Sequence, residues 1–215
     1  MNPIRLKIQI PENKIAVGHS RFWGNPDLPI GVDYPMFIDE DGDQYPYFFI
    51  CQINLEKLAS FAPNNPLPHT GLLSFFAKID HYIGYSNADY EIGGHVSNPD
   101  AVKVLYFPTT DTLREVILVD EEDNQTSPNE LEICFTTDMG KLDDEHILFA
   151  EPTHREWETW ESPFEDWTIL LQIDSFEGKD FKLNFMDFGV MDFLISPVSL
   201  EKHDFSDVRG IILST

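Results

Sequence analysis

Apolar residues in this chain gather in short runs bounded by glycine, proline and acidic residues, and this pattern constrains the fold more than any other feature. The clearest run lies at 47–53 and is rich in aromatic and β-branched residues, as expected for a strand buried on both faces. Further runs of this kind lie at 71–77, 102–107, 115–119 and 170–174. The sequence therefore predicts a β-rich fold.

Two local patterns predict the ends of particular elements. Near the start, apolar and polar residues alternate, which predicts a half-buried strand whose inward side chains are Ile4, Leu6, Ile8 and Ile10. Asn54 directly follows the run at 47–53. Its side chain can accept backbone N–H bonds and so cap a short helix over 55–61. Pro63 then ends that helix.

Three segments between these runs are predicted to be loops. The segment 19–35 is rich in glycine and proline. We expect it to be ordered, because its apolar residues would not be left in water without a reason; these are Phe22, Trp23, Leu28 and Ile30. The segment 39–44 is typical of a turn, and 120–128 is typical of an exposed acidic loop.

The pattern of strands occurs twice along the chain. Gln52 and Gln172 each end an apolar strand in Gln-Ile-Asn or Gln-Ile-Asp, and Gly71 and Gly189 each begin the strand that follows. We therefore interpret residues 1–215 as a single compact domain with an internal duplication, whose halves cover about 20–119 and 150–215. The alternative is that any two antiparallel meanders look alike, because apolar strand patterns are common.

Composition narrows the class of protein. Hydrophobic residues make up 42% of the chain, which is globular composition. Fourteen basic residues against 38 acidic ones give a net charge of −24, which would repel nucleic acid and anionic membranes. Two explanations of this acidity remain open: it attracts a basic protein partner, or it only keeps the protein in solution.

The same bulk features predict where the protein resides. No apolar run reaches the length of roughly 20 residues that a membrane-spanning helix needs, and the start does not have the pattern of an export signal. Cys51 and Cys134 each lie in an apolar stretch. They are therefore interpreted as reduced core thiols, and the protein is expected to be cytoplasmic.

Several motifs together resemble the YwqG-like family, a bacterial group of unknown function. They are Ser-Arg-Phe-Trp-Gly-Asn-Pro-Asp-Leu-Pro at 20–29, Pro-Tyr-Phe-Phe-Ile-Cys-Gln-Ile-Asn-Leu at 46–55, Leu-Pro-His-Thr-Gly-Leu-Leu-Ser-Phe-Phe at 67–76, Leu-Leu-Gln-Ile-Asp-Ser at 170–175 and the closing pieces at 187–189, 204–206 and 211–214. The resemblance implies an α+β fold, mostly antiparallel β-sheet with a few short helices. It brings no activity and no catalytic residue.

The chain departs from this resemblance in two respects. Only nineteen residues precede Ser20, where family members commonly carry a longer helical segment. The family's glycine pair corresponds here to Trp23 and Gly24. A tryptophan at that position is expected to fill any hollow in the loop.

Gln52 and Gln172 are candidate site residues because they are polar groups in very apolar strands. An unpaired buried amide costs about 1–3 kcal/mol, so each must be hydrogen-bonded. The favoured interpretation is structural, with each amide tying its strand to a neighbouring loop. The alternative is a pseudo-symmetric pair lining a site between the halves.

The sequence predicts no catalytic residue, no metal site and no cofactor. Its seven histidines lack the spacing of a local metal site, although His154 and Glu158 would share one helix face. Asp39, Asp41 and Asp43 surround a glycine at the wrong position for a calcium loop, so a hairpin turn is favoured. Nucleotide-binding and hydrolase motifs are absent from the sequence.

The stretch 151–167 is the most unusual candidate surface, because it interleaves aromatic and acidic residues. On a helix Trp157, Trp160 and Phe164 would form one apolar stripe. The favoured interpretation is a packing helix. The alternative is an aromatic anchor surrounded by acid, which would suit a basic protein surface and would include Glu161 and Trp167.

The leading hypothesis is a non-catalytic, acidic protein-binding module, in one version an immunity-type protein that neutralises a basic toxin or nuclease. The alternative is a small-ligand or metal-dependent enzyme with its site in the cleft between the halves. A third possibility is a structural component that self-associates. The sequence leaves the oligomeric state open.

Overall fold

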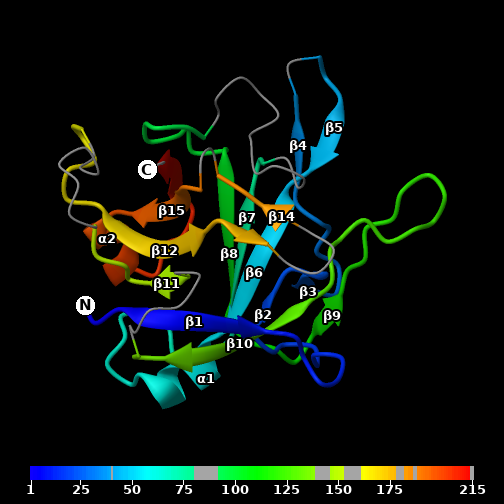
Figure 1. Ribbon diagram of the computed structural model, residues 1–215, viewed down its shortest axis with the longest axis horizontal. Coiled ribbons are helices and arrows are strands. Elements are labelled where there is room, and N and C mark those ends of the chain that lie inside the picture. Colours follow the sequence, from blue (N-terminus) through cyan, green and yellow to red (C-terminus); the bar gives the residue numbers. More distant parts are fainter. Residues whose placement is uncertain are drawn as a thin grey trace.

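The computed structural model describes residues 1–39, 41–79, 92–138, 146–152, 161–177, 182–185 and 188–213. Over these residues the fold is mostly antiparallel β-sheet (Figure 1), as the sequence predicted. Two short helices accompany the sheet, α1 (Leu55–Phe61) and α2 (Pro197–Glu201). Neither described helix has the length or apolar character needed to cross a membrane.

One ten-stranded sheet organises the molecule. Its strand order is β16-β15-β12-β11-β1-β10-β2-β6-β7-β8. The bounds are β1 (Ile4–Gln9), β2 (Arg21–Phe22), β6 (Phe48–Asn54), β7 (Leu72–Ala77), β8 (Val102–Phe107), β10 (Leu131–Thr136), β11 (Ile147–Leu148), β12 (Thr168–Asp174), β15 (Val190–Ile195) and β16 (Arg209–Leu213).

Among the described residues, three two-stranded sheets accompany this large sheet. They pair β3 (Asp27–Pro29) with β9 (Leu113–Glu115), β4 (Met36–Ile38) with β5 (Gln44–Pro46), and β13 (Phe176–Glu177) with β14 (Lys182–Leu183). The β4–β5 hairpin projects from the body of the molecule (Figure 1). It contains the turn predicted at 39–44, where Asp39 Oδ1 accepts the backbone N–H groups of Asp41 and Asp43.

The large sheet curls until its two ends nearly meet, which makes it almost a barrel. Segment 92–98 lines the free edge of β16: Ser97 donates its N–H to the Gly210 carbonyl, and Ile212 donates to the Gly93 carbonyl, both at 2.8 Å. Inside the curl, the rings of Phe75 on β7 and Phe193 on β15 lie 5.3 Å apart. Side chains from both ends of the sheet therefore share one core.

The two arms of the sheet, β2-β6-β7-β8 and β11-β12-β15-β16, repeat a local geometry. In each arm the register of one strand pair shifts once. The β6–β7 register shifts after Phe49, and the β12–β15 register shifts after Ile169. At these points Trp23 donates its N–H to the Ile50 carbonyl at 2.9 Å, and Phe149 donates to the Leu170 carbonyl at 3.2 Å. Trp23 and Phe149 both have a φ of 57°.

The helix predicted over 55–61 is confirmed, with its cap. Helix α1 spans Leu55–Phe61, and Asn54 Oδ1 accepts the backbone N–H of Lys57 at 2.8 Å. The helix buries Leu55 and Leu58 in the core. The cap follows β6 without a spacer, so the chain passes directly from strand to helix.

Three local predictions are wrong. Ile10, predicted to be an inward residue of the first strand, lies beyond the end of β1 and is 74% exposed. The strand predicted over 115–119 lies instead at Leu113–Glu115, because these residues pair with β3. Ile117 and Val119 beyond it are 51% and 52% exposed. In the ordered loop 19–35, Phe22, Trp23 and Leu28 are buried as predicted, but Ile30 is 74% exposed.

A substitution at Gly71 tests the close contact between the residue before β7 and the end of β8. Its φ is +91°, and a Cβ there would overlap the Phe107 carbonyl oxygen. We expect Gly71→Ala to lower the free energy of unfolding by more than about 2 kcal/mol, measured by urea denaturation. Gly31 is the control, because its φ is +89° but nothing lies within 4 Å.

Gly31→Ala should lose only the cost of the left-handed backbone, about 1 kcal/mol. Equal losses in the two variants would contradict the close contact between Gly71 and the end of β8.

Candidate functional site

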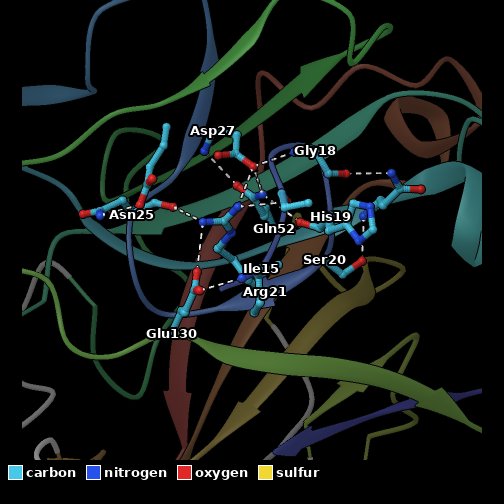
Figure 2. A network of polar contacts seen from close by, with 12 residues as sticks. Ile15, Gly18, His19, Ser20, Arg21, Asn25, Asp27, Gln52 and Glu130 are labelled. Carbon is cyan, nitrogen blue, oxygen red and sulfur yellow. Dashed lines mark hydrogen bonds and ion pairs between the residues drawn. The ribbon is translucent and has the colours of Figure 1, made fainter. Parts of the chain in front are cut away.

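A buried polar cluster ties β2 and β6 to the loop that follows β2. We call Arg21, Asp27, Gln52 and Glu130 the Arg21 network (Figure 2). Arg21 opens β2 and lies opposite Gln52 of β6. Its guanidinium, which is completely buried, donates from Nη2 to Asp27 Oδ2 at 2.9 Å and from Nη1 to Glu130 Oε2 at 3.1 Å. Two carboxylates therefore compensate one buried cation.

Gln52 completes this network from the neighbouring strand. Its Oε1 accepts the backbone N–H of Asp27 at 2.9 Å, and its Nε2 donates to Asp27 Oδ2 at 2.6 Å and to the His19 carbonyl at 2.8 Å. Asp27 Oδ2 also accepts the backbone N–H of Gly18 at 2.8 Å. These bonds match the favoured interpretation of Gln52, in which the amide ties its strand to a loop.

Glu130 connects the network to the surface. Its Oε1 accepts the backbone N–H of Ile15 at 2.8 Å. Its Cβ lies against Gly24, where an added Cβ would come within 2.7 Å, and Gly24 has a φ of +72°. Trp23 before it has a φ of 57°, so both positions of the expected glycine pair adopt the left-handed conformation that favours glycine.

Trp23 is 1% exposed and belongs to the main core. It is also one of the residues that line a groove of about 580 Å³. The other lining residues come from the end of β1 and the loop after it, from the start of β10 and from β13: Ile8, Gln9, Ile10, Pro11, Glu12, Asn13, Lys14, Asn129, Glu130, Leu131, Phe176 and Glu177.

The floor of the groove is apolar and continuous with the core. Ile8, Leu131 and Phe176 are partly buried and pack against the main core cluster. The ring of Phe176 lies 5.2 Å from that of Trp23 and 5.9 Å from that of His146, which is completely buried. The floor is therefore a firm surface, supported by aromatic packing from below.

Three carboxylates and one basic residue line the groove: Glu12, Glu130, Glu177 and Lys14. Glu130 is paired with Arg21, and Lys182 Nζ lies 3.8 Å from Glu177 Oε2. Lys14 forms an ion pair with Glu115. Partial burial alone would raise the pKa of Glu115, but hydrogen bonds from Asn25 and Lys14 hold that pKa below its usual range.

A second cavity of about 310 Å³ lies near the β4–β5 hairpin. Five of the twelve described residues that line it are aromatic, among them Tyr34, Tyr45 and Tyr47. Tyr34 donates its hydroxyl to the Tyr47 carbonyl at 2.8 Å, and burial raises its pKa. The carboxylates that line the larger groove distinguish it from this cavity.

The other predicted site residues that the structure describes do not line the groove. Gln172 is buried in β12, opposite Asp192 of β15, and neither it nor Gln52 lines the groove or the second cavity. Trp167 is partly buried and packs on Phe164, with ring centroids 4.9 Å apart. Glu161 is exposed, while Trp157 and Trp160 lie outside the described residues.

The residues considered for metal or thiol chemistry are placed as follows. In the described part of the chain, no group of three or more histidine, cysteine, aspartate or glutamate side chains has the arrangement of metal ligands. His154 and Glu158 lie outside it. Cys51 is buried in β6, and burial raises the pKa of its thiol.

The protein is therefore a curled antiparallel sheet. A groove with an apolar floor and carboxylates at its rim lies beside the central strands of this sheet. The chain matches, over residues 20–212, the model of a family described as a domain of unknown function, DUF1963. This chain belongs to that family. A comparison with curated proteins finds no match.

Sequence reasoning missed the groove. Its walls come from segments far apart in the chain, and no motif joins them. One signal was present, because the alternation that begins at Ile4 continues to Ile10, which is 74% exposed and lines the groove.

Removing Asp27 tests whether the Arg21 network holds this region together. Asp27→Ala leaves the Arg21 cation with Glu130 as its remaining carboxylate and leaves Gln52 Nε2 with one acceptor fewer. We expect a loss of about 3–5 kcal/mol in the free energy of unfolding, measured by urea denaturation.

The matched control is Asp33→Ala, which removes an exposed carboxylate from the same loop. It should change stability by less than about 0.5 kcal/mol. A loss of similar size in both variants would show that the network does not stabilise the fold.

Proposed function

We propose that this protein is a non-catalytic, acidic binding module, and that a basic segment of a protein partner docks in the groove. The observation that carries the proposal is the combination of a partly exposed apolar floor, formed by Ile8, Leu131 and Phe176, with two exposed carboxylates, those of Glu12 and Glu177. A site of this composition suits long cationic side chains.

The chemistry of lysine and arginine supports this choice of partner. Both have aliphatic stems that pack on apolar surface while the charged head stays near solvent. A stem crossing Phe176 would bring its charge to Glu12 or Glu177, which are both exposed. The net charge of −24 adds a long-range field that speeds encounter with a basic protein.

The Arg21 network supports a binding role for the groove more than a catalytic one. Glu130, the member that reaches the groove, accepts hydrogen bonds at both of its carboxylate oxygens. Asp27 and Gln52 are directed to the loop and to each other. Binding at the groove could neutralise a basic toxin or nuclease by covering its surface, which is the immunity-type version of the proposal.

A second candidate is a small-ligand protein or enzyme that uses the same groove. Its volume of about 580 Å³ lies within the usual range of ligand pockets, roughly 300–1,000 Å³. This candidate differs from the first in its salt dependence, because a neutral ligand would bind equally well at low and high ionic strength.

We also propose that the chain is an internal duplication. The sheet order supports this proposal. β1, the first strand of one half, pairs with β11 of the other half, and β10, the first strand of that other half, pairs with β2. The halves then correspond as β1-β2-β6-β7-β8 and β10-β11-β12-β15-β16, and both begin earlier than the halves of about 20–119 and 150–215 that the sequence predicted. Ser20 Oγ accepts the N–H of Asn54 at 2.8 Å, and at the corresponding place His146 Nδ1 accepts the N–H of Asp174 at 3.2 Å.

Two finer statements accompany this proposal. We infer that the family membership extends to the YwqG-like group, on the motif order at 20–29, 46–55 and 67–76. We also infer a cytoplasmic location, which agrees with two cysteines that form no disulfide, Cys51 and Cys134.

Charge reversal at the rim tests the binding site. A pool of nine-residue peptides with arginine at alternate positions and apolar residues between them is screened for binding. Titration calorimetry then measures the Kd of its tightest-binding member. We expect Glu12→Lys with Glu177→Lys to weaken binding tenfold or more, equivalent to about 1.4 kcal/mol. Raising the salt concentration should weaken binding to the wild type.

The control variant carries Glu121→Lys with Glu122→Lys, which changes the net charge equally in the exposed acidic loop. It should stay within about twofold of the wild type at moderate salt. Equal weakening by both variants would assign binding to the overall field, and no binding of the pool at any salt would overturn the proposed function.

A further inference from the structure

The core-facing side of the β1–β10 ladder has an apolar residue at each end. In this ladder Leu6 pairs with Phe135, and Ile8 pairs with Ile133. Residues directly opposite each other, and residues two apart along one strand, direct their side chains to the same face. Leu6 and Ile133 are buried in the middle of this face. Ile8 and Phe135 lie at its two ends, where they are partly buried and pack against the main core cluster.

Strand pairing shows that these two ends occupy equivalent places in the fold. Ile4, the first residue of β1, pairs with the last residue of β11, and Leu131, the first residue of β10, pairs with the last residue of β2. The residue after β11 and the residue after β2 both have a φ of 57°. Ile8 and Phe135 are each the fifth residue of their strand. They therefore correspond in position.

A side chain of the protein itself packs on the end at Phe135. Helix α1 follows β6 and lies beside β10 (Figure 1). Its residues Leu55 and Leu58 enter the core. The ring of Phe61, the last residue of the helix, lies 6.0 Å from the ring of Phe135. At this end of the ladder, an aromatic side chain thus supplies the packing partner.

The groove lies at the other end of the ladder, beside Ile8. In the second arm the residues after β12 form β13, and Phe176 packs on Trp23, with ring centroids 5.2 Å apart. Ile8 and Phe176 both line the groove. The groove therefore lies at the place that corresponds to the position of Phe61 at the first end.

We propose that the partner's basic segment anchors in the groove through an aromatic side chain, which packs on Ile8 as Phe61 packs on Phe135. This inference rests on the proposed function and specifies the chemistry of the partner. Buried aromatic anchors often dominate the energy of protein interfaces. Phe176 offers such an anchor a second ring, and pairs of aromatic rings attract each other beyond the area that they bury.

The charges at the groove place basic residues next to this anchor. Glu12 and Glu177 are exposed and line the same groove as Ile8. An arginine or lysine beside the anchor brings its charge to one of these carboxylates, while its aliphatic stem covers apolar surface. The motif expected in the partner is therefore a phenylalanine, tyrosine or tryptophan with basic residues close on both sides.

Substitutions in a binding peptide test the anchor and leave the protein unchanged. In the tightest-binding member of the arginine-alternating pool, each apolar position is changed in turn to phenylalanine, leucine and alanine, and titration calorimetry measures Kd. At one position we expect phenylalanine to bind about threefold or more tighter than leucine, and about tenfold or more tighter than alanine, because this side chain packs on Ile8. At the other apolar positions Kd should change by less than about threefold.

Ile8→Phe tests where the anchor packs. This substitution gives the groove the ring that Phe135 provides at the other end of the ladder. We expect it to raise the preference for the phenylalanine peptide over the leucine peptide about threefold or more, through contact between rings. The control is Ile38→Phe, which should leave the preference unchanged, because Ile38 is 68% exposed and does not line the groove. If Ile8→Phe does not fold, the peptide series decides alone.

The remaining outcomes separate this inference from the proposed function. If the peptide loses affinity with Glu12→Lys and Glu177→Lys, but every apolar position accepts phenylalanine, leucine and alanine equally, the groove binds without an aromatic anchor and this inference is overturned. An aromatic preference that Ile8→Phe leaves unchanged also overturns it, because the anchor then packs elsewhere. If no peptide of the pool binds, the proposed function fails and this inference fails with it.

Discussion

The antiparallel pairing of β1 with β10 is the interaction on which the rest of the sheet depends. These strands lie at the centre of the ten-stranded order, and each separates the other from one arm. The pairing joins residues more than a hundred positions apart, such as Lys7 with Cys134. The end of β1 and the start of β10 lie side by side through this pairing, and both line the groove. The groove is therefore built on the central ladder of the sheet.

The Arg21 network fixes the wall of the groove that lies beyond β10. Arg21 is buried with two carboxylates, Asp27 and Glu130, and this arrangement is costly to break because it would leave an uncompensated charge in the core. Through Glu130 it orients the start of β10, and the tight contact of Glu130 with Gly24 positions Trp23 behind the groove. The buried ion pairs of Arg21 thus help to shape the groove that we propose as the binding surface.

Local chemistry explains how much of this could be predicted from the sequence. The strand at 47–53 and the cap of Asn54 depend on neighbouring residues, so their patterns were sufficient. The hydrogen bonds of Gln52 follow from the cost of burying an amide. The groove depends on the register of β1 with β10 and on Phe176 reaching Trp23, and these long-range contacts have no local sequence signal. The strand predicted at 115–119 failed because pairing with β3 at Leu113–Glu115 decided the register, whereas apolar content had suggested the later residues.

Backbone-amide NMR of the protein titrated with the arginine-alternating peptide tests the groove most directly. The account predicts that the largest peptide-induced shifts fall on Ile8, Leu131 and Phe176, which line the groove, and that Glu121 and Glu122 in the exposed acidic loop stay unchanged. Shifts confined to that acidic loop, or spread evenly over the surface, would contradict the account, because binding would then depend on the overall charge and not on the groove.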